Sequence, residues 1–244
     1  MTTIQIITLF PELFVSFINT SIIKNAVKKE KVKFNIINLR DFAIDKHQQV
    51  DDYQYGGGNG MVLMAPIVVA AINYAREQIP NSQVILLSPQ GKTFKQDIAS
   101  EMASSNNSLI LVCGHYEGFD ERIRDFVDME ISIGDYVLSA GEIASMVISD
   151  AVIRLLPGVI QEASHQNDSF TSKYLDYPVF TKPLVFNNQQ VPDVLLSGHH
   201  KNIDIWRKQQ AFYNTYKKRP DLIDLNQSTP QEQIWITELE KDKK

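Results

Sequence analysis

The stretch "ISIGDYVLSAGEIA", residues 131–144, is the most informative part of this sequence about fold and ligand binding. It begins like the end of a buried strand, but Gly134, Asp135, Gly141 and Glu142 interrupt the apolar pattern that would continue the strand. Glycine adopts backbone conformations that are costly for other residues, and it allows a ligand to approach the main chain closely. We therefore expect residues 131–144 to wrap around a ligand, although a plain turn is the alternative.

Two other predicted strands run into similar motifs. "QVILLS" (83–88) is followed by "PQGK", and "SLILVC" (108–113) is followed by "GHYEG". Ligands of open parallel sheets bind outside the carboxyl ends of the strands, so three such motifs together predict a small-molecule site. "YGGGNGM" (55–61) lacks the last glycine of a dinucleotide fingerprint, and no P-loop motif occurs. A ligand held mainly by its phosphates is therefore disfavoured.

Strand and helix patterns alternate along the first 155 residues. This alternation predicts an α/β fold with a parallel sheet and helices on both faces. The connections 41–66 and 161–192 are long, which is typical of functional or disordered loops. After Pro192 the pattern is helical, with a capping box at Thr229 and Glu232. We expect a cofactor-binding domain at 1–160, a linker or active-site loop at 161–192 and a small helical domain at 193–244. The predicted strands are 3–9, 32–39, 83–88, 108–113 and 129–133, and the predicted helices are 11–30, 66–78 and 94–104.

The amino-acid composition favours a soluble globular protein over a membrane or disulfide-rich secreted protein. The chain has 244 residues, 43% hydrophobic and 22% charged, which is ordinary for a soluble globular protein. Its one cysteine, Cys113, cannot form an internal disulfide, and the N-terminus lacks signal-peptide features, so we predict a cytoplasmic location. No stretch approaches the ~20 apolar residues that cross a bilayer, and we expect no membrane role.

Charge is unevenly distributed. The chain carries a net charge of −5, but residues 201–219 contain a net charge of +5. Such a segment favours contact with phosphate groups, and its aromatic residues Trp206, Tyr213 and Tyr216 suit stacking on unpaired bases. The alternative is a solvated amphipathic helix that buries Trp206, Phe212 and Tyr216. The charged residues of the segment are Lys201, Asp204, Arg207, Lys208, Lys217, Lys218 and Arg219.

Seven ordered motifs resemble those of the bacterial tRNA (guanine-N1)-methyltransferases. The resemblance implies a SPOUT-type parallel sheet in which the segment 131–144 threads a loop and forms a deep trefoil knot, with a small C-terminal helical domain. Knots are nearly absent from proteins, so strand patterns alone would not predict one. The motifs are "DDYQYGGGNGMV", "LLSPQGK", "CGHYEGFDERI", "ISIGDYVLSAGE", "RLLPGV", "NDSF" and "VPDVLLSGHH" with "IDIWR".

The resemblance implies that S-adenosylmethionine binds, bent, inside the knot. Ala140 and Ala144 depart from the family pattern, which has glycine and proline there. If Ala140 had a positive φ, the strain would be roughly 1 kcal/mol or more. The implied cofactor-binding residues are Leu87, Ser88, Pro89, Gly114, Tyr116, Glu117, Ile133, Gly134, Asp135, Tyr136, Val137, Leu138 and Gly141.

For catalysis, the resemblance implies that Asp168 removes the N1 proton of guanine and that Arg154 stabilises the charge developing on O6. A free aspartate, with a pKa of ~3.9, is a weak base for this proton, so a nearby cation helps. From the residues alone, Asp168 is typical of a helix cap and Arg154 of a helix-end cation. The family's dependence on Mg²⁺ is implied as well, but no metal-ligand cluster is visible in the sequence.

The implied partners are the anticodon stem-loop of tRNA and a second copy of the chain. We expect a homodimer with shared active sites, in which Asp168 reaches the partner's cofactor. The alternatives are a methyltransferase of another RNA and an RNA-binding module that has lost its chemistry. The implied tRNA contacts are His47, Asp51, Gly57, Gly58, Ser197, Gly198, His200, Lys201, Arg207 and Lys208.

Overall fold

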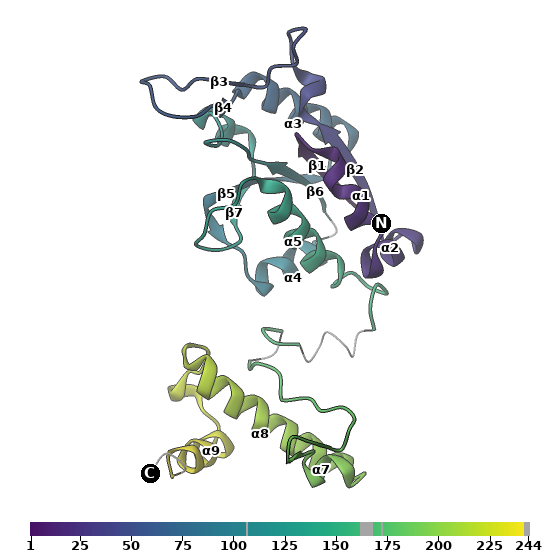
Figure 1. The fold of residues 1–244 in the computed structure, drawn as a ribbon, viewed down its shortest axis with the longest axis vertical. Helices are drawn as coiled ribbons and strands as arrows, with labels where there is room; N and C mark the ends of the chain where they lie inside the picture. Colours follow the sequence, from purple (N-terminus) through teal and green to yellow (C-terminus); the bar gives the residue numbers. More distant parts are fainter. Residues whose placement is uncertain (106, 162–167, 172, 242–244) are drawn as a thin grey trace. The chain divides into compact units, whose positions relative to one another are not determined.

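A five-stranded parallel sheet forms the centre of the first part of the chain (Figure 1). The computed structural model describes residues 1–105, 107–161, 168–171 and 173–241. The strand order is β2-β1-β6-β5-β7, and every neighbouring pair is parallel. This arrangement confirms the predicted α/β fold. The strands are β1 (Thr2–Thr8), β2 (Val32–Asn38), β5 (Ser82–Thr93), β6 (Ser108–Cys113) and β7 (Met129–Ser132).

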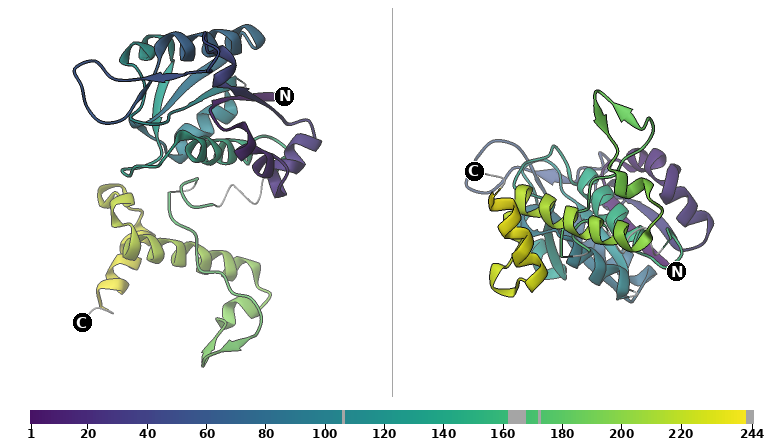
Figure 2. Two further views of the ribbon diagram at one scale, coloured as in Figure 1. Left: turned by 45° about the horizontal axis from the view of Figure 1, so that its top comes forward. Right: turned by 90° about the horizontal axis from the view of Figure 1, so that it is seen from below.

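Helices cover both faces of this sheet (Figures 1 and 2). One face packs against α3, and the other packs against α2, α4 and α5. All of β6 is buried, as expected for a continuous apolar run between two covered faces. No helix in the described part of the chain is long and apolar enough to span a membrane. The helical elements are η1 (Pro11–Leu13), α1 (Phe14–Ile18), α2 (Ser21–Lys28), η2 (Leu39–Phe42), α3 (Ala65–Gln78), α4 (Gln96–Ser104), η3 (Glu121–Phe126) and α5 (Gly141–Ile153).

The strand β5 does not end at residue 88, where the sequence predicts a turn. Both Leu87 and Lys92 pair with Ile131 of β7, and the register shifts between them. Residues 88–91 therefore form an excursion from the strand, after which β5 continues to Thr93. The predicted end of the strand at residue 88 is therefore wrong, because β5 runs through "PQGK" with a shift of register and pairs again with β7 beyond it.

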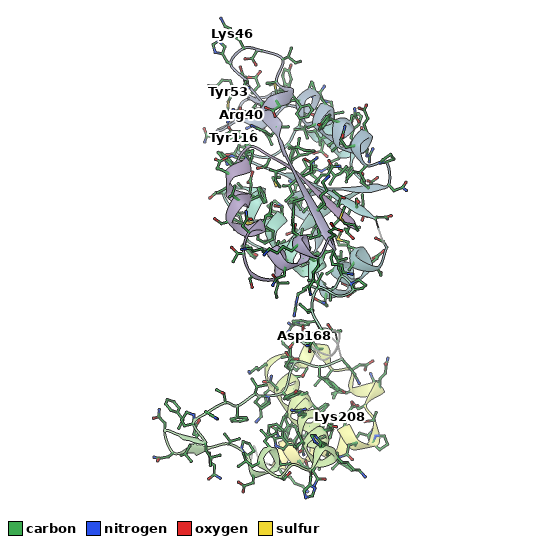
Figure 3. All side chains as sticks on the ribbon, turned by 90° about the vertical axis from the view of Figure 1, so that its right-hand side faces the viewer. Arg40, Lys46, Tyr53, Tyr116, Asp168 and Lys208 are labelled. Atoms are coloured by element: carbon green, nitrogen blue, oxygen red, sulfur yellow. The ribbon has the colours of Figure 1, made fainter. Side chains whose placement is uncertain are left out.

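The long connection after β2 is mostly a surface loop. Within it, β3 (Asp51–Asp52) and β4 (Val62–Leu63) form an antiparallel pair. Val50 and Leu63 are buried and hold the base of the loop to the core around α3. The tip between β3 and β4, which carries Tyr53, is exposed, and so is Lys46 in the segment before β3 (Figure 3).

The second compact unit comprises residues 163–244, and the first comprises residues 1–162. A small core of Phe212, Trp235 and Leu239 holds the helices of the second unit together. Leu175 donates a backbone hydrogen bond of 2.8 Å to Thr215 Oγ1, which ties the preceding segment to α8. The predicted linker at 161–192 stays a prediction. The elements are β8 (Val185–Phe186), β9 (Gln189–Gln190), α7 (Asp193–Leu196), α8 (His200–Lys218), η4 (Pro220–Leu222), η5 (Leu225–Gln227) and α9 (Pro230–Lys241).

The predicted capping box at the start of α9 is confirmed. The Thr229 amide donates to Glu232 Oε2 at 2.7 Å, and the Glu232 amide donates to Thr229 Oγ1 at 3.3 Å. This reciprocal pair satisfies two backbone N–H groups at the helix start.

Candidate active site

A cavity of about 360 Å³ opens at the carboxyl ends of β5, β6 and β7. Its walls come from the excursion after Leu87, from the "GHYEG" turn and from the segment 131–141. All the predicted cofactor residues except Asp135 line it, so the structure brings together three motifs that lie far apart in the sequence. That these residues bind a cofactor stays a prediction. The lining residues among those predicted are Leu87, Ser88, Pro89, Gly114, Tyr116, Glu117, Ile133, Gly134, Tyr136, Val137, Leu138 and Gly141.

Glycine is required where two of these segments cross. The Gly141 amide donates to the Gly114 carbonyl at 2.7 Å. A Cβ on Gly141 would lie 2.7 Å from the Gly114 nitrogen and 2.9 Å from the Cys113 Cα, both of which are backbone atoms that cannot move aside. The first residue of α5 therefore sits directly on the end of β6, which explains why the apolar pattern of 131–144 is broken at Gly141.

The departures from the family pattern do not distort this segment. Ala140 has a φ of −163°, which is extended backbone, so the strain considered for a positive φ does not arise. It forms an isolated bridge with His115 across the cavity wall. Ala144 is buried in the core and also lines the cavity. Gly134, by contrast, has a φ of +147°, and a Cβ there would lie 2.6 Å from Tyr136 Cε1.

The "GHYEG" turn joins the cavity to the loop predicted to contact substrate. The Glu117 amide donates to the Met61 carbonyl at 3.0 Å, and a Cβ on Gly60 would lie 2.5 Å from Glu117 Cγ. The loop bearing Gly57 and Gly58 is thus rooted beside a wall of the cavity.

Two side chains of this loop were missed by sequence reasoning. Tyr53 is 78% exposed and Tyr55 is fully exposed. Exposed aromatic rings beside glycines are suited to stacking on unpaired bases. Their position two residues apart, immediately before a run of glycines, was the available signal.

A buried carboxylate lies behind the cavity. Glu142, in the first turn of α5, is 1% exposed, and Thr8 Oγ1 donates to its Oε1 at 2.6 Å. Burial, together with the Glu142 carboxylate, raises the pKa of the Cys113 thiol well above its usual value. Because the thiolate is the nucleophilic form of cysteine, Cys113 is an inert core residue.

Arg154 lies at the opposite end of α5 from the cavity. It caps the helix, and its amide donates to the Asp150 carbonyl at 3.1 Å. A helix of 13 residues separates it from Gly141, a distance of roughly 20 Å at 1.5 Å per residue. Arg154 is not among the residues that line the cavity of its own chain.

Asp168 belongs to the second unit. It is partly buried, and its carbonyl accepts a hydrogen bond from the Thr171 amide at 3.1 Å. Residues 168–171 form a turn, and no described helix begins there, so the alternative of a helix cap is not supported. Asn167 of the "NDSF" motif lies outside the described residues.

The predicted tRNA contacts lie at the surface in both units. His47, Gly57 and Gly58 are exposed in the first unit, and Asp51 is partly exposed. In the second unit Arg207 is partly buried, with its Nη1 3.8 Å from Asp204 Oδ1 and its guanidinium 5.0 Å from the Tyr177 ring centre. The exposed ones there are Ser197, Gly198, His200, Lys201 and Lys208.

The aromatic residues of α8 are mainly structural. Phe212 is fully buried, and Tyr213 and Tyr216 pack against it. This packing favours the amphipathic-helix alternative for both tyrosines. Trp206 is partly buried, with its ring centre 6.4 Å from that of Phe180.

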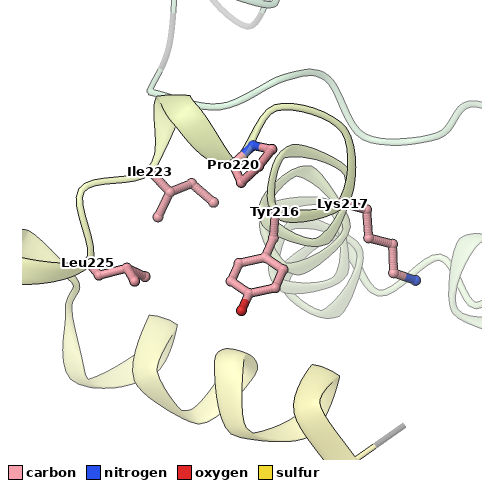
Figure 4. Close-up of a pocket in the computed structure, with 5 residues that line it drawn as sticks. All are labelled: Tyr216, Lys217, Pro220, Ile223 and Leu225. Atoms are coloured by element: carbon pink, nitrogen blue, oxygen red, sulfur yellow. The ribbon is translucent and has the colours of Figure 1, made fainter. Parts of the chain in front are cut away.

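A second cavity, of about 490 Å³, lies beside the end of α8 (Figure 4). Its walls are largely apolar, and Tyr216 and Lys217 contribute the polar groups. This lining has no carboxylic acid or second basic side chain beside the lysine, so nothing in it indicates catalysis. The lining residues are Tyr216, Lys217, Pro220, Ile223 and Leu225.

The described residues do not form a carboxylate-rich binding site for the implied Mg²⁺. Across the part of the chain that the structure describes, no group of three or more histidine, cysteine, aspartate or glutamate side chains is placed to hold a metal ion. Mg²⁺ needs oxygen ligands in a near-octahedral arrangement. We therefore derive no step through a metal.

The family model and the relatives that match this chain all carry the same description. The family model described as tRNA (Guanine-1)-methyltransferase TrmD matches residues 2–225. The tRNA (guanine-N(1)-)-methyltransferase of Ureaplasma urealyticum serovar 10 is 58% identical over 219 residues, which are 90% of this chain and 95% of the relative. The enzymes of that name from Mycoplasma mycoides subsp. mycoides SC and Bacillus cereus strain B4264 are 54% and 49% identical, over 91% and 98% of this chain and 91% and 99% of the relatives. The chain therefore belongs to the tRNA (guanine-1)-methyltransferase family.

Proposed function

We propose that this protein transfers a methyl group from S-adenosylmethionine to N1 of the guanosine immediately 3′ of the anticodon in tRNA. Membership of the family supports the reaction and the class of substrate. The observation that carries the proposal is the cavity at the carboxyl ends of β5, β6 and β7, where Gly114 and Gly141 bring two backbones into contact.

The cavity fits the methyl donor. Its walls combine apolar side chains with the backbone of Gly114, Gly134 and Gly141, which allows a ligand to approach the main chain closely. The predicted cofactor residues that line the cavity would hold the donor. Asp135 was predicted as well, but it does not line the cavity. When bound, S-adenosylmethionine supplies the methyl group on a sulfonium, which leaves as a neutral thioether.

We infer that the segment after β7 threads the chain to form the trefoil knot of the SPOUT class. Two observations support this inference. The strand β7 lies beyond β5, while β6, which precedes it in the sequence, lies on the other side of β5. The chain then returns, so that Gly141 packs on Cys113 and Gly114 at the end of β6.

The chemistry requires removal of one proton. As the methyl carbon bonds to guanine N1, the N1 proton moves to the Asp168 carboxylate, and the electrons of the carbon–sulfur bond stay on sulfur. Aspartate is a weak base for this proton, so the reaction needs a cation near O6, where negative charge develops. We assign that role to Arg154.

We propose that the active sites are shared between two copies of the chain. Arg154 lies roughly 20 Å along α5 from the Gly141 end, so it cannot reach the cavity of its own chain without breaking the helix. In a homodimer, Arg154 and Asp168 of one chain would instead act at the cavity of the other chain, so Arg154 would not have to reach its own. Function on tRNA is consistent with the predicted cytoplasmic location.

We place the anticodon stem-loop on two surfaces. One is the loop with His47, Gly57 and Gly58, which is rooted beside Glu117 and brings RNA close to the cavity. The other is the basic start of α8, where Lys201, Arg207 and Lys208 would contact phosphates.

The proposal is tested with total tRNA and methyl-labelled S-adenosylmethionine, followed by mass spectrometry of the nucleosides. The expected product is labelled 1-methylguanosine. Label in another nucleoside would contradict the proposed reaction. No transfer, together with no binding of S-adenosylmethionine by calorimetry, would favour an RNA-binding module without activity.

A further inference from the structure

The side chain of Arg124, on η3, contacts three separate segments beside the cavity. Its Nε and Nη2 donate to the two carboxylate oxygens of Glu130, at 3.1 and 3.0 Å. Its Nη2 also donates to Gln90 Oε1 at 3.0 Å, and its Nη1 pairs with Glu121. The guanidinium thus connects η3, β7 and the excursion 88–91.

The excursion has two other points of attachment. The Gln90 amide donates to Ser88 Oγ at 3.0 Å, which closes the turn internally. Gly91 lies so close to β7 that an added Cβ would be 2.4 Å from the Ile131 nitrogen. Between these points, the bond from Arg124 to Gln90 is a side-chain link from the excursion to the rest of the unit. Ser88, Pro89 and Gln90 form one wall of the cavity, and Arg124 lines the cavity as well.

The geometry suits arginine alone. The bonds to Glu130 are bidentate, and the side chains of Arg124 and Glu130 are 25% and 20% exposed, so solvent weakens the pair less than it weakens a surface pair. Lysine could supply the charge but not a planar fork that reaches Glu130 and Gln90 together. The hydrogen bond to Glu130 raises the pKa of Arg124, and a guanidinium is in any case charged at ordinary pH.

We propose that Arg124 is a positioning residue that holds the excursion 88–91 against β7 and so sets the width of the cofactor cavity. It acts through Gln90 on the wall formed by Ser88 and Pro89, rather than on the reacting atoms. The identity of the ligand, S-adenosylmethionine, rests on the proposed function.

The Gln90→Ala variant separates positioning from stability. It removes the acceptor on the excursion but leaves the Arg124–Glu130 pair intact. We expect the Kd and the KM for S-adenosylmethionine to rise about three- to tenfold, as for the loss of one ordinary intramolecular hydrogen bond. The kcat at saturating S-adenosylmethionine should stay within about twofold and the Tm within about 1 °C, because the core and the ion pair are untouched.

Three further variants sharpen the test. Gln90→Glu keeps an oxygen acceptor and should restore the wild-type Kd within about twofold. Arg124→Lys keeps the charge but loses the fork, and should weaken binding at least as much as Gln90→Ala. Arg122→Gln is the matched control: this arginine pairs with Asp120, two residues earlier, its side chain is 73% exposed, and its loss should leave the Kd unchanged.

Hydrogen exchange tests the same inference without any ligand. In the unliganded protein, the amides of residue 88 and of residues 90–93 should exchange faster in Gln90→Ala than in wild type, and at the wild-type rate in Arg122→Gln. Unchanged exchange and unchanged Kd in folded Gln90→Ala would overturn the inference, as would a kcat that falls in parallel with the affinity. If wild-type protein failed to bind S-adenosylmethionine while the exchange difference appeared, the proposed function would fail and the positioning role would stand.

Discussion

The amide of Gly141 donates a hydrogen bond of 2.7 Å to the carbonyl of Gly114, which places the start of α5 on the end of β6. These residues lie 27 positions apart in the sequence, yet each lines the same cavity. The contact leaves no room for a side chain at Gly141, since the nearest atoms are backbone. The cavity therefore depends on a backbone crossing rather than on a particular polar side chain.

The Gly141→Ala variant should lose binding of S-adenosylmethionine and also lose stability. Its Cβ would meet the Gly114 nitrogen at 2.7 Å, and forcing an extra carbon into a packed site costs about 1–3 kcal/mol or more. Gly114→Ala is the graded comparison, because its closest contact is the side chain of Phe119 at 2.8 Å, which can shift. Calorimetric titration and thermal unfolding measure both effects. Equal, small losses in the two variants would contradict the importance of the crossing.

The shared-site model predicts complementation between two inactive variants. Asp168→Ala should nearly abolish methyl transfer but keep affinity for S-adenosylmethionine within a few-fold, because the cavity is in the other unit. Gly134→Val should abolish cofactor binding, since Gly134 has a φ of +147°, which strains any side chain, and an added Cβ would lie 2.6 Å from Tyr136 Cε1 in the cavity wall. When the two chains are co-expressed, a mixed dimer has one site with both defects and one with neither, so activity should return.

The control for this experiment is the mixed dimer itself. Two different affinity tags, purified in succession, establish that mixed dimers have formed. If these dimers stay inactive, each site is built within one chain and the sharing model is wrong.

The basic start of α8 should control how tRNA binding depends on salt. Replacing Lys201, Arg207 and Lys208 with alanine should weaken binding and reduce the slope of log K against log salt by up to ~2 to 3, if all three contact phosphates. The matched control replaces three exposed lysines of the first unit and removes the same charge, and it should leave the slope unchanged. An equal loss of slope in both variants would point to a general charge effect. The control lysines are Lys24, Lys28 and Lys33.

The carboxylate of Glu232 should make stability depend on pH. Burial opposes its ionisation, but hydrogen bonds from Tyr174 and from the Thr229 amide outweigh burial and lower the pKa of Glu232 below its ordinary value. A lowered pKa stabilises the folded state above the unfolded pKa of about 4.3, and this contribution is lost as the pH falls through the folded pKa. Glu232→Gln should therefore lower the Tm at pH 7, and the difference from wild type should disappear toward pH 3.

Glu240→Gln is the control for this pH effect. Glu240 lies exposed on the same helix, and its replacement should change the Tm little at either pH. A difference between Glu232→Gln and wild type that persists at pH 3 would show that packing, not charge, holds Glu232 in place.

Local sequence patterns correctly predicted those strands and helix caps whose form does not depend on contacts with distant residues. The apolar run of β6 is buried on both faces and was recognisable as a strand, and the Thr229–Glu232 capping box depends only on residues three apart. The resemblance likewise selected residues that line one cavity, because the motifs for three adjacent strand ends occur together.

Other features depend on contacts that no local pattern contains. Strand β5 continues after Gly91 because it pairs there with β7. The turn residues "PQGK" therefore predicted the end of this strand too early. The extended φ of Ala140 follows from its bridge to His115. The Arg124–Gln90 bond joins residues 34 positions apart, and neither residue belongs to a recognised pattern.

The position of the methyl group on a defined tRNA tests the central claim most directly. A transcript with guanosine 3′ of the anticodon is incubated with enzyme and labelled S-adenosylmethionine, and the modified nucleotide is located by mass spectrometry of nuclease fragments. The account predicts one labelled methyl group, on N1 of that guanosine, and none in a transcript that carries adenosine there. Label at any other nucleotide, or equal label in the adenosine transcript, would contradict it.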